Sequence, residues 1–442
     1  MTIRMDEGAA ELLDTLHRAG YAAYVEGGCV RDSLLGLTPH DWDLCTSALP
    51  QQGMELFGEE KCIPTGLQHG TVTVRQGGGL YEITTFRTEG TYTDGRHPDE
   101  VHFVPDVRED LARRDFTINA MAYNEKEGLV DPFGGQTDLQ SGILRAVGVP
   151  HQRFTEDALR ILRLYRFAAR FGFSIDPPTA QAAQELCAHL DCVSVERIEE
   201  ELAKLLSAPA PAAYLDEKIL GVVLPELSPE ALAAAKPVVD ACPAGERALP
   251  VRLAALLLSL GEDGTRRTLR RLRCSNACIE ETAVLVREVV SGVPGAFSSD
   301  TNRAIPSPAL LPAATGSHPS GRSSEKLPAR PPVSLNIYTR KLLGQYGLKT
   351  VQRLAALGTA LQPEHAADFA ALSELAEQLD ADGVCCRVSQ LAVNGRDLMA
   401  AGVPSGPGIR KVLEALLDGV IREEYPNERQ ALLTAVQQLA AS

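Results

Sequence analysis

The sequence has no apolar run near the roughly 18 residues that a membrane-spanning helix requires. No apolar stretch follows the first residues, Met1 to Glu7, so the pattern of a signal peptide is missing as well. The ten cysteines form no Cys-x-x-Cys pair and no regular framework, which argues against zinc sites and disulfides. These absences predict a soluble chain with reduced thiols, a cytoplasmic location and no membrane partner.

An excess of positive charge is also missing, because the formal net charge is -15. As an average, this charge argues against a polyanionic partner. Nucleic acids are held by local patches, however, and the arginines of this chain gather in a few segments. The length of 442 residues is too great for one ordinary core and predicts about two to four domains.

A glycine pair and a carboxylate pair lie close together near the N-terminus. Gly27 and Gly28 follow a short apolar run, where bare backbone N–H groups can approach a phosphate. Asp41 and Asp43 stand at i and i+2, so on an extended strand their side chains would leave the same face. Converging carboxylates repel each other, and oxygen ligands completed by waters and phosphates suit Mg²⁺ better than zinc.

Either pair alone also fits a plain alternative, because Asp-x-Asp occurs on solvated strands and Gly-Gly is often only a turn. Joined at this spacing across Arg31, the two pairs resemble the nucleotidyltransferase signature of the DNA polymerase β superfamily. In that superfamily, paired aspartates hold two Mg²⁺ ions that activate a 3′ hydroxyl and neutralise a triphosphate.

Residues 71–75 and 81–86 alternate as strands around a run of three glycines, which predicts a hairpin. Glu82 is the candidate third carboxylate, and its alternative role is to pair with an arginine across the hairpin. The polar, glycine-punctuated residues 87–100 are expected to form a mobile loop beside the site. Residues 111–122 place charged groups in a buried helical pattern, so those groups fix a ligand or pair with one another.

Residues 153–170 predict one helix with an apolar side and a charged side, capped by Thr155. At about 100° per residue, the charged side carries one acid and a ladder of arginines. These residues are Asp157, Arg160, Arg163 and Arg166.

Two later segments differ in character. Residues 266–273 form a basic helix face, which is either only solvated or in contact with RNA phosphates. Residues 292–333 are rich in proline, serine and glycine and predict a disordered insert.

Taken in order, these motifs resemble those of class II bacterial CCA-adding tRNA nucleotidyltransferases. The segments that carry the resemblance are 27–32, 41–43, 113–120, 156–160 and 391–398. The resemblance covers nearly the whole chain except the insert, and it implies an α+β fold. A small polymerase β-like head with a five-stranded sheet would precede an all-α neck, body and tail. The implied bounds are 1–148 for the head, 149–206 for the neck, 207–380 for the body with the insert at 292–333, and 381–442 for the tail.

The resemblance also implies roles for individual residues. Asp41 and Asp43 would bind Mg²⁺ and act in catalysis, and Asp157 and Arg160 would select the base. Further contacts to the nucleotide would come from Gly28, Arg31, Arg114, Arg163 and Arg166. For Arg166, the alternative is a salt bridge within the neck.

Base selection by one acid and one arginine has a physical rationale. Cytosine and adenine both present an amine beside a ring-nitrogen acceptor, which a carboxylate and a guanidinium can bind. Uracil and guanine present a carbonyl beside an N–H, so both contacts become repulsive. One Asp–Arg pair can therefore choose C and A without a nucleic-acid template.

The expected function is addition of CCA to the 3′ end of tRNA from CTP and ATP, with release of pyrophosphate. An enzyme that adds only A, or a poly(A) polymerase, is the alternative within the class, although residues 418–442 lack a polybasic tail. The loop at 87–100 resembles that of the full-activity enzymes in residues 88–90 and 94–96, and this resemblance disfavours a CC-only enzyme. A small-molecule nucleotidyltransferase would have no use for the neck arginines, and a non-catalytic RNA-binding protein would not need both aspartates.

Overall fold

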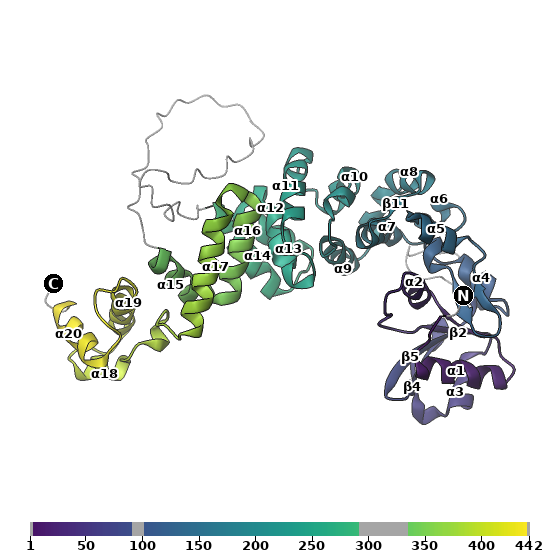
Figure 1. Cartoon of the computed structure of the whole chain (residues 1–442), viewed down its shortest axis with the longest axis horizontal. Helices are drawn as coiled ribbons and strands as arrows, with labels where there is room; N and C mark the ends of the chain where they lie inside the picture. The colour runs from purple at the N-terminus through teal and green to yellow at the C-terminus, as the bar shows by residue number, and fades with distance from the viewer. Residues whose placement is uncertain (1–2, 91–100, 291–334, 440–442) are drawn as a thin grey trace. The chain divides into compact units, whose positions relative to one another are not determined.

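The computed structural model describes residues 3–90, 101–290 and 335–439. The chain separates into two compact units, Met1–Pro225 and Glu226–Ser442. The first unit contains the strands, and the described part of the second is helical (Figure 1). The predicted insert at 292–333 and residues 91–100 of the predicted loop lie outside the described residues. The finer division into head, neck, body and tail remains a prediction.

The main sheet is mixed and has seven strands in the order β3-β4-β5-β2-β1-β8-β9. β2 and β5 run parallel, and the other neighbours run antiparallel. The α+β class is confirmed, but the expected five strands are too few, because β3 and β9 extend the sheet at its two edges. The strands are β1 (Ala23–Glu26), β2 (Leu44–Thr46), β3 (Cys62–Gly66), β4 (Thr71–Gln76), β5 (Gly79–Thr85), β8 (Ala122–Asn124) and β9 (Gly128–Val130).

The predicted hairpin is present as β4 and β5. Gly77 and Gly78 connect the two strands with φ values of 57° and 86°, which glycine adopts without steric cost. Two smaller two-stranded sheets pair β6 (Arg87–Glu89) with β7 (Val101–Phe103) and β10 (Ile143–Leu144) with β11 (Ser174–Ile175). Part of the predicted loop at 87–100 is therefore strand.

Short helices flank the sheet. Figure 1 shows α1 and α3 on one side of it and α2 on the other. The Asp6 carboxylate caps α1 by accepting from the N–H groups of Gly8 and Ala9 at 3.1 and 3.3 Å. These helices are α1 (Glu7–Arg18), α2 (Gly28–Leu34), α3 (Pro50–Phe57), α4 (Val107–Ala112) and α5 (Gly135–Ser141).

Five further α-helices follow in the described part of the first unit, and among them α7 packs on α9. They are α6 (Pro150–Glu156), α7 (Leu159–Phe171), α8 (Pro177–Glu185), α9 (Val195–Leu206) and α10 (Glu217–Val223). Most of α7 is buried, with the exposed or half-buried positions occupied mainly by arginines. The predicted apolar side of this helix is confirmed, but the predicted charged side is only partly present, because Arg166 is buried with the apolar residues.

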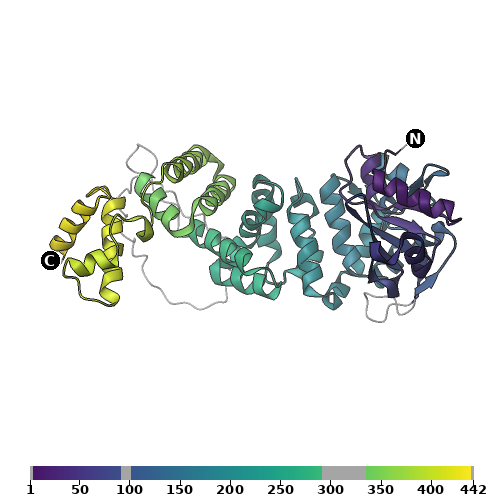
Figure 2. The ribbon, with the colours of Figure 1, turned by 90° about the horizontal axis from the view of Figure 1, so that it is seen from below.

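In the second unit, α12 packs against α11, α14 and α16, and α16 packs against α17 (Figure 2). The last three helices enclose a small core of their own around Leu398, Leu416 and Leu432. The helices are α11 (Pro229–Ala241), α12 (Leu249–Leu257), α13 (Gly261–Arg271), α14 (Asn276–Val290), α15 (Leu335–Tyr346), α16 (Leu348–Leu361), α17 (Ala366–Ala381), α18 (Gly395–Ala400), α19 (Pro407–Ile421) and α20 (Arg429–Leu439).

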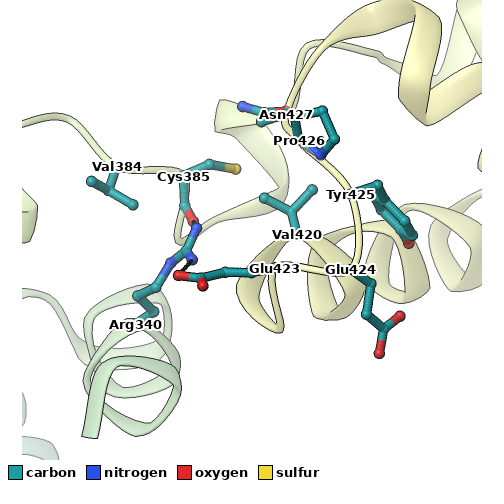
Figure 3. A pocket seen from close by; sticks show the side chains of 9 residues that line it. All are labelled: Arg340, Val384, Cys385, Val420, Glu423, Glu424, Tyr425, Pro426 and Asn427. Atoms are coloured by element: carbon teal, nitrogen blue, oxygen red, sulfur yellow. Dashed lines mark hydrogen bonds and ion pairs between the residues drawn. The ribbon is translucent and has the colours of Figure 1, made fainter. Parts of the chain in front are cut away.

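An open pocket of about 520 Å³ lies between α15 and the last helices (Figure 3). The buried Arg340 of α15 donates to the carbonyl oxygens of Ile421 at 3.3 Å and Cys385 at 3.2 Å. These bonds join α15 to the C-terminal helices. The pocket is lined by Arg340, Val384, Cys385, Val420, Glu423, Glu424, Tyr425, Pro426 and Asn427.

Candidate active site

The glycine pair forms a tight connection between β1 and α2. Gly27 has φ 70° and ψ −121°, where any side chain would be strained. Its N–H donates to the Met121 carbonyl at 3.0 Å. A Cβ on Gly27 would lie 3.4 Å from Nη1 of Arg114, and one on Gly28 would lie 3.6 Å from Nη2 of Arg31. The turn therefore lies against two of the predicted nucleotide-binding arginines.

Asp41 and Asp43 lie in irregular backbone directly before β2, and not within a strand as expected. The Asp43 carbonyl nevertheless accepts from the Glu26 N–H at 3.0 Å, so the contact with β1 begins there. Because Glu26 immediately precedes Gly27, this hydrogen bond fixes Asp43 beside the glycine turn.

Two other carboxylates, those of Asp41 and Glu82, act on Asp43. Although Asp43 is exposed, the protein around it displaces enough water to raise its pKa. The positive charge of Arg114 opposes this shift, and the negative charges of Glu82 and Asp41 add to it. Glu82 is exposed on β5, opposite Thr73 on β4. Asp43 therefore lies within electrostatic reach of both Asp41 and Glu82.

A divalent cation fits this set of oxygen donors, because it would relieve the repulsion between the acids. No group of three or more potential metal ligands gathers within residues 3–90, 101–290 and 335–439. A cation held by Asp41 and Asp43 would therefore need further oxygen ligands from water or phosphate.

Arg114 is held by two buried acids. Its guanidinium forms an ion pair with Glu26, and Nη2 lies 3.6 Å from Oδ2 of Asp110. Burial alone would lower the pKa of Arg114, but these two negative charges raise it. The Arg114 side chain remains 24% exposed, so it can still reach a ligand.

Arg31 is buried, and its guanidinium donates hydrogen bonds to other side chains of the protein. Nε donates to Asp32 at 2.8 Å, and Nη1 donates to Oδ1 of Asn119 at 2.5 Å. The guanidinium lies 5.3 Å from the ring centre of Phe167 and 4.9 Å from that of Phe171. Burial lowers the pKa of Arg31.

Asp157 lies at a break between two helices, and not within one continuous helix as expected. α6 ends at Glu156, Asp157 is extended, and α7 begins at Leu159. The Asp157 carboxylate accepts from the Leu159 N–H at 3.0 Å. Asp157, and not Thr155 as expected, therefore binds a free backbone N–H at the start of α7. Arg197 of α9 also donates to Asp157, at 2.8 and 3.4 Å.

Arg160 lies on the first turn of α7. It donates to Oε2 of Glu156 at 2.7 Å and to the carbonyl oxygens of Arg153 at 3.2 Å and Arg113 at 3.0 Å. Both members of the predicted base-reading pair therefore sit within three residues of the helix break, with their orientation fixed by neighbours.

Arg163 and Arg166 are held by acids from other segments. Arg163 donates to Oδ2 of the buried Asp115 at 2.9 and 2.7 Å. Arg166 is itself buried, forms an ion pair with Glu201 of α9, and lies 3.8 Å from the ring centre of Phe167. The neck salt bridge considered for Arg166 is therefore present.

The segment 113–115 links the two halves of the site. The positive charge of Arg114 acts to lower the pKa of Asp43. The Arg113 carbonyl accepts a hydrogen bond from Arg160, and the Asp115 carboxylate accepts from Arg163. Contrary to expectation, residues 111–122 do not form one helix. α4 ends at Ala112 and is followed by a 3₁₀ turn and β8, so each side chain of this segment faces a different partner.

The sequence did not single out Glu26, Arg197 and Glu201 as partners of predicted site residues. In the sequence, Glu26 directly follows the apolar residues 22–25, which was a signal that it could be buried and that its charge would then need compensation. Arg197 and Glu201 stand at i and i+4 on α9 and face α7. Their spacing could have suggested a shared face but not their partners.

Over the described part of the chain, no helix combines the length and the apolar character needed to cross a bilayer. Three family models match: a poly A polymerase head domain at residues 23–145, a probable RNA and SrmB-binding site of polymerase A at 172–230, and a putative tRNA nucleotidyltransferase domain 2 at 336–436. The mixed-sheet head, the helical remainder and these matches thus define a nucleotidyltransferase with a poly A polymerase head domain.

Relatives that match over nearly their full length identify the family within this class of nucleotidyltransferases. The CCA-adding enzyme of Lactiplantibacillus plantarum is 35% identical over 99% of this chain and 97% of its own length. The CCA-adding enzyme of Limosilactobacillus fermentum is 36% identical over 98% of this chain and 97% of its own length. The crystal structure of the Bacillus stearothermophilus CCA-adding enzyme in complex with CTP has a TM-score of 0.77 and 29% identity, covering 99% of this chain and 98% of that one. The chain belongs to the family of CCA-adding enzymes, which are tRNA nucleotidyltransferases and generally use a divalent metal.

Proposed function

We propose that this protein adds C, C and A to the 3′ end of tRNA, using CTP and ATP and releasing pyrophosphate. The observation that carries the proposal is identity above 30% with CCA-adding enzymes over nearly the full length of both chains. A protein that adds only A, or a poly(A) polymerase, is disfavoured because the full-length relatives are CCA-adding enzymes. The tRNA substrate and the ten free cysteines support a cytoplasmic location.

Asp41 and Asp43 are the proposed ligands of Mg²⁺, with Glu82 as a nearby third carboxylate. When bound, Mg²⁺ would polarise the α-phosphate, lower the pKa of the 3′ hydroxyl and neutralise charge on the leaving pyrophosphate. The hydrogen bond from the Glu26 N–H to the Asp43 carbonyl holds this ligand beside the glycine turn. The donors and the phosphate-binding turn would thus be placed together before substrate arrives.

Gly28 and Arg114 are the proposed contacts to the triphosphate. Gly27 and Gly28 leave room for close approach to the backbone, and Arg114 lies beside them with part of its side chain exposed. Arg31 and Arg166 are buried in internal hydrogen bonds and ion pairs, so we propose that they support the nucleotide site through their neighbours. Arg163 is about one third exposed and keeps access to a ligand.

Asp157 and Arg160 are the proposed base-reading pair. At the helix break, Oδ1 of Asp157 accepts from the Leu159 N–H at the start of α7, and Arg197 donates mainly to Oδ2, at 2.8 Å, and more weakly to Oδ1, at 3.4 Å. A carboxylate has about four lone-pair sites, so it can also accept from the amine of cytosine or adenine. Arg160 would donate to the adjacent ring nitrogen, and uracil or guanine would oppose both groups.

We propose that the exposed Arg267 and Arg270 of α13 approach the phosphates of tRNA. Arg266 and Arg271 on the same helix pair with acids instead, namely Glu262 and Glu226. The division into a head at 1–148, a neck at 149–206, a body at 207–380 and a tail at 381–442 also remains our proposal.

The first test uses the purified full chain with tRNA that lacks CCA, or that ends in CC, and labelled CTP or ATP. We expect C and A to be added in order to the first tRNA and a single A to the second. Asp43→Ala should lower the rate at least about a thousandfold with the fold intact, because it removes several kcal/mol of transition-state stabilisation.

Asp14→Asn is the matched control, because it changes an exposed carboxylate paired with Arg18 on α1. It should leave the rate unchanged. Addition of A alone would indicate an A-adding enzyme, and a long run of A would indicate a poly(A) polymerase. Full activity of Asp43→Ala would overturn the metal-ligand assignment.

A further inference from the structure

Glu26 is a buried acid next to the site whose role the reaction described above does not explain. It ends β1 directly before Gly27, and only 2% of its surface is exposed. A lone buried carboxylate is costly, so it requires a compensating partner. Arg114 supplies that partner through an ion pair.

Asp110, the second acid near Arg114, accepts hydrogen bonds from other groups. Oδ1 of Asp110 accepts from Nε and Nη2 of Arg113 at 3.0 and 2.9 Å, and from the backbone N–H of Arg87 at 3.1 Å. Its Oδ2 lies 3.6 Å from Arg114 Nη2, which is beyond hydrogen-bond distance. Glu26 is therefore the closer and stronger constraint on the Arg114 guanidinium.

The ion pair with Glu26 fixes the orientation of the Arg114 guanidinium as well as its position. Arg114 places Nη2 on Glu26 and Nη1 beside Gly27, 3.4 Å from where a Cβ on that glycine would be. An arginine without such a partner would sample many rotamers, and fixing it on binding would cost side-chain entropy. Glu26 removes part of that cost in advance.

We propose that Glu26 is a positioning residue that aims Arg114 at the phosphate groups of the incoming nucleotide. This inference rests on the proposed function, because it requires a nucleoside triphosphate at the glycine turn. Glu26 itself is buried behind Arg114 and does not touch the substrate. Because it acts on the phosphate end, its effect is the same for CTP and ATP and leaves the choice of base unchanged.

The test compares Glu26→Gln with the wild-type enzyme in steady-state addition to tRNA. Glutamine keeps the size and one acceptor but removes the charge that holds Arg114. We expect KM for CTP and for ATP to rise by the same factor of roughly five to ten, with kcat within about twofold and discrimination against UTP unchanged. A purely structural role would instead lower the amount of folded enzyme and leave KM unaltered.

Two further variants make the outcome specific. Asp138→Asn is the matched control, because Asp138 is also buried in the head and pairs with an arginine, Arg145, outside the proposed site. Both of its KM values should stay at the wild-type level. In the double variant Glu26→Gln/Arg114→Gln, KM should equal that of Arg114→Gln alone, because Glu26 acts through Arg114.

Unchanged KM in Glu26→Gln, or additive effects in the double variant, would overturn the positioning role while the wild-type enzyme still adds CCA. An inactive wild-type enzyme would refute the proposed function instead. The two failures are therefore distinguishable.

Discussion

Replacing Asp115 with Asn tests whether one buried carboxylate joins the head to the arginine helix α7. Oδ2 accepts from Nε and Nη2 of Arg163 at 2.9 and 2.7 Å. Oδ1 accepts from the Phe116 N–H at 2.8 Å and from Nδ2 of Asn119 at 3.0 Å. An asparagine would keep the second pair of bonds but turn an NH₂ group toward the donors of Arg163.

The magnitude follows from this geometry. Breaking a buried charge pair by removing one partner costs about 3–5 kcal/mol, because the remaining charge is left uncompensated. Arg163 is about one third exposed and can recover some hydration, so we expect the lower part of that range, about 3 kcal/mol. Denaturant unfolding of the full chain would measure the loss in the transition that reports on the first unit. Hydrogen exchange would locate the loss in α7.

The same carboxylate predicts a pH dependence. Burial alone would raise the pKa of Asp115, but Arg163 and the hydrogen bond from Asn119 outweigh it and hold the pKa well below the usual range. A carboxyl with a depressed folded pKa stabilises the protein above its unfolded pKa of about 3.9 and loses that effect as pH falls toward the folded pKa. The difference in unfolding free energy between wild type and Asp115→Asn should therefore be constant near neutral pH and shrink below about pH 4.

Asp14→Asn controls for the chemical change itself, because the exposed Asp14–Arg18 pair is worth at most about 1 kcal/mol. An Asp115→Asn variant no less stable than Asp14→Asn would refute the role of Asp115 as a buried link. A stability difference that grows on acidification would refute the depressed pKa.

Two further predictions concern the base and the glycine turn. Asp157→Ala should reduce discrimination against UTP by about ten- to a hundredfold, since a charged hydrogen bond is worth about 1.5–3 kcal/mol. Incorporation of UTP relative to CTP measures this, and unchanged discrimination would count against base reading by Asp157. Gly27→Ala should cost about 1–3 kcal/mol of stability, because φ at this position is 70°. Gly53→Ala in α3 is its control, with open space around the site and no positive φ, and it should be neutral or slightly stabilising.

The β4–β5 hairpin and the apolar side of α7 followed directly from the sequence. Both depend on interactions between near neighbours, namely alternation along a strand, glycines in a turn and a helical repeat. The pairing of a glycine turn with two aspartates was equally readable, because all four residues lie within one short segment. The class of protein and the residues to examine were therefore available before any coordinates.

The tertiary structure alone decided which charges face each other. Glu26 and Arg114 are 88 positions apart, and Asp115 lies 48 residues before Arg163. No local repeat relates such residues, so the sequence could show an excess of buried charge but not its pairing. The break at Asp157 was hidden for the same reason. The helical pattern continues through it, and only the bonds to Leu159 and to the distant Arg197 set the conformation there.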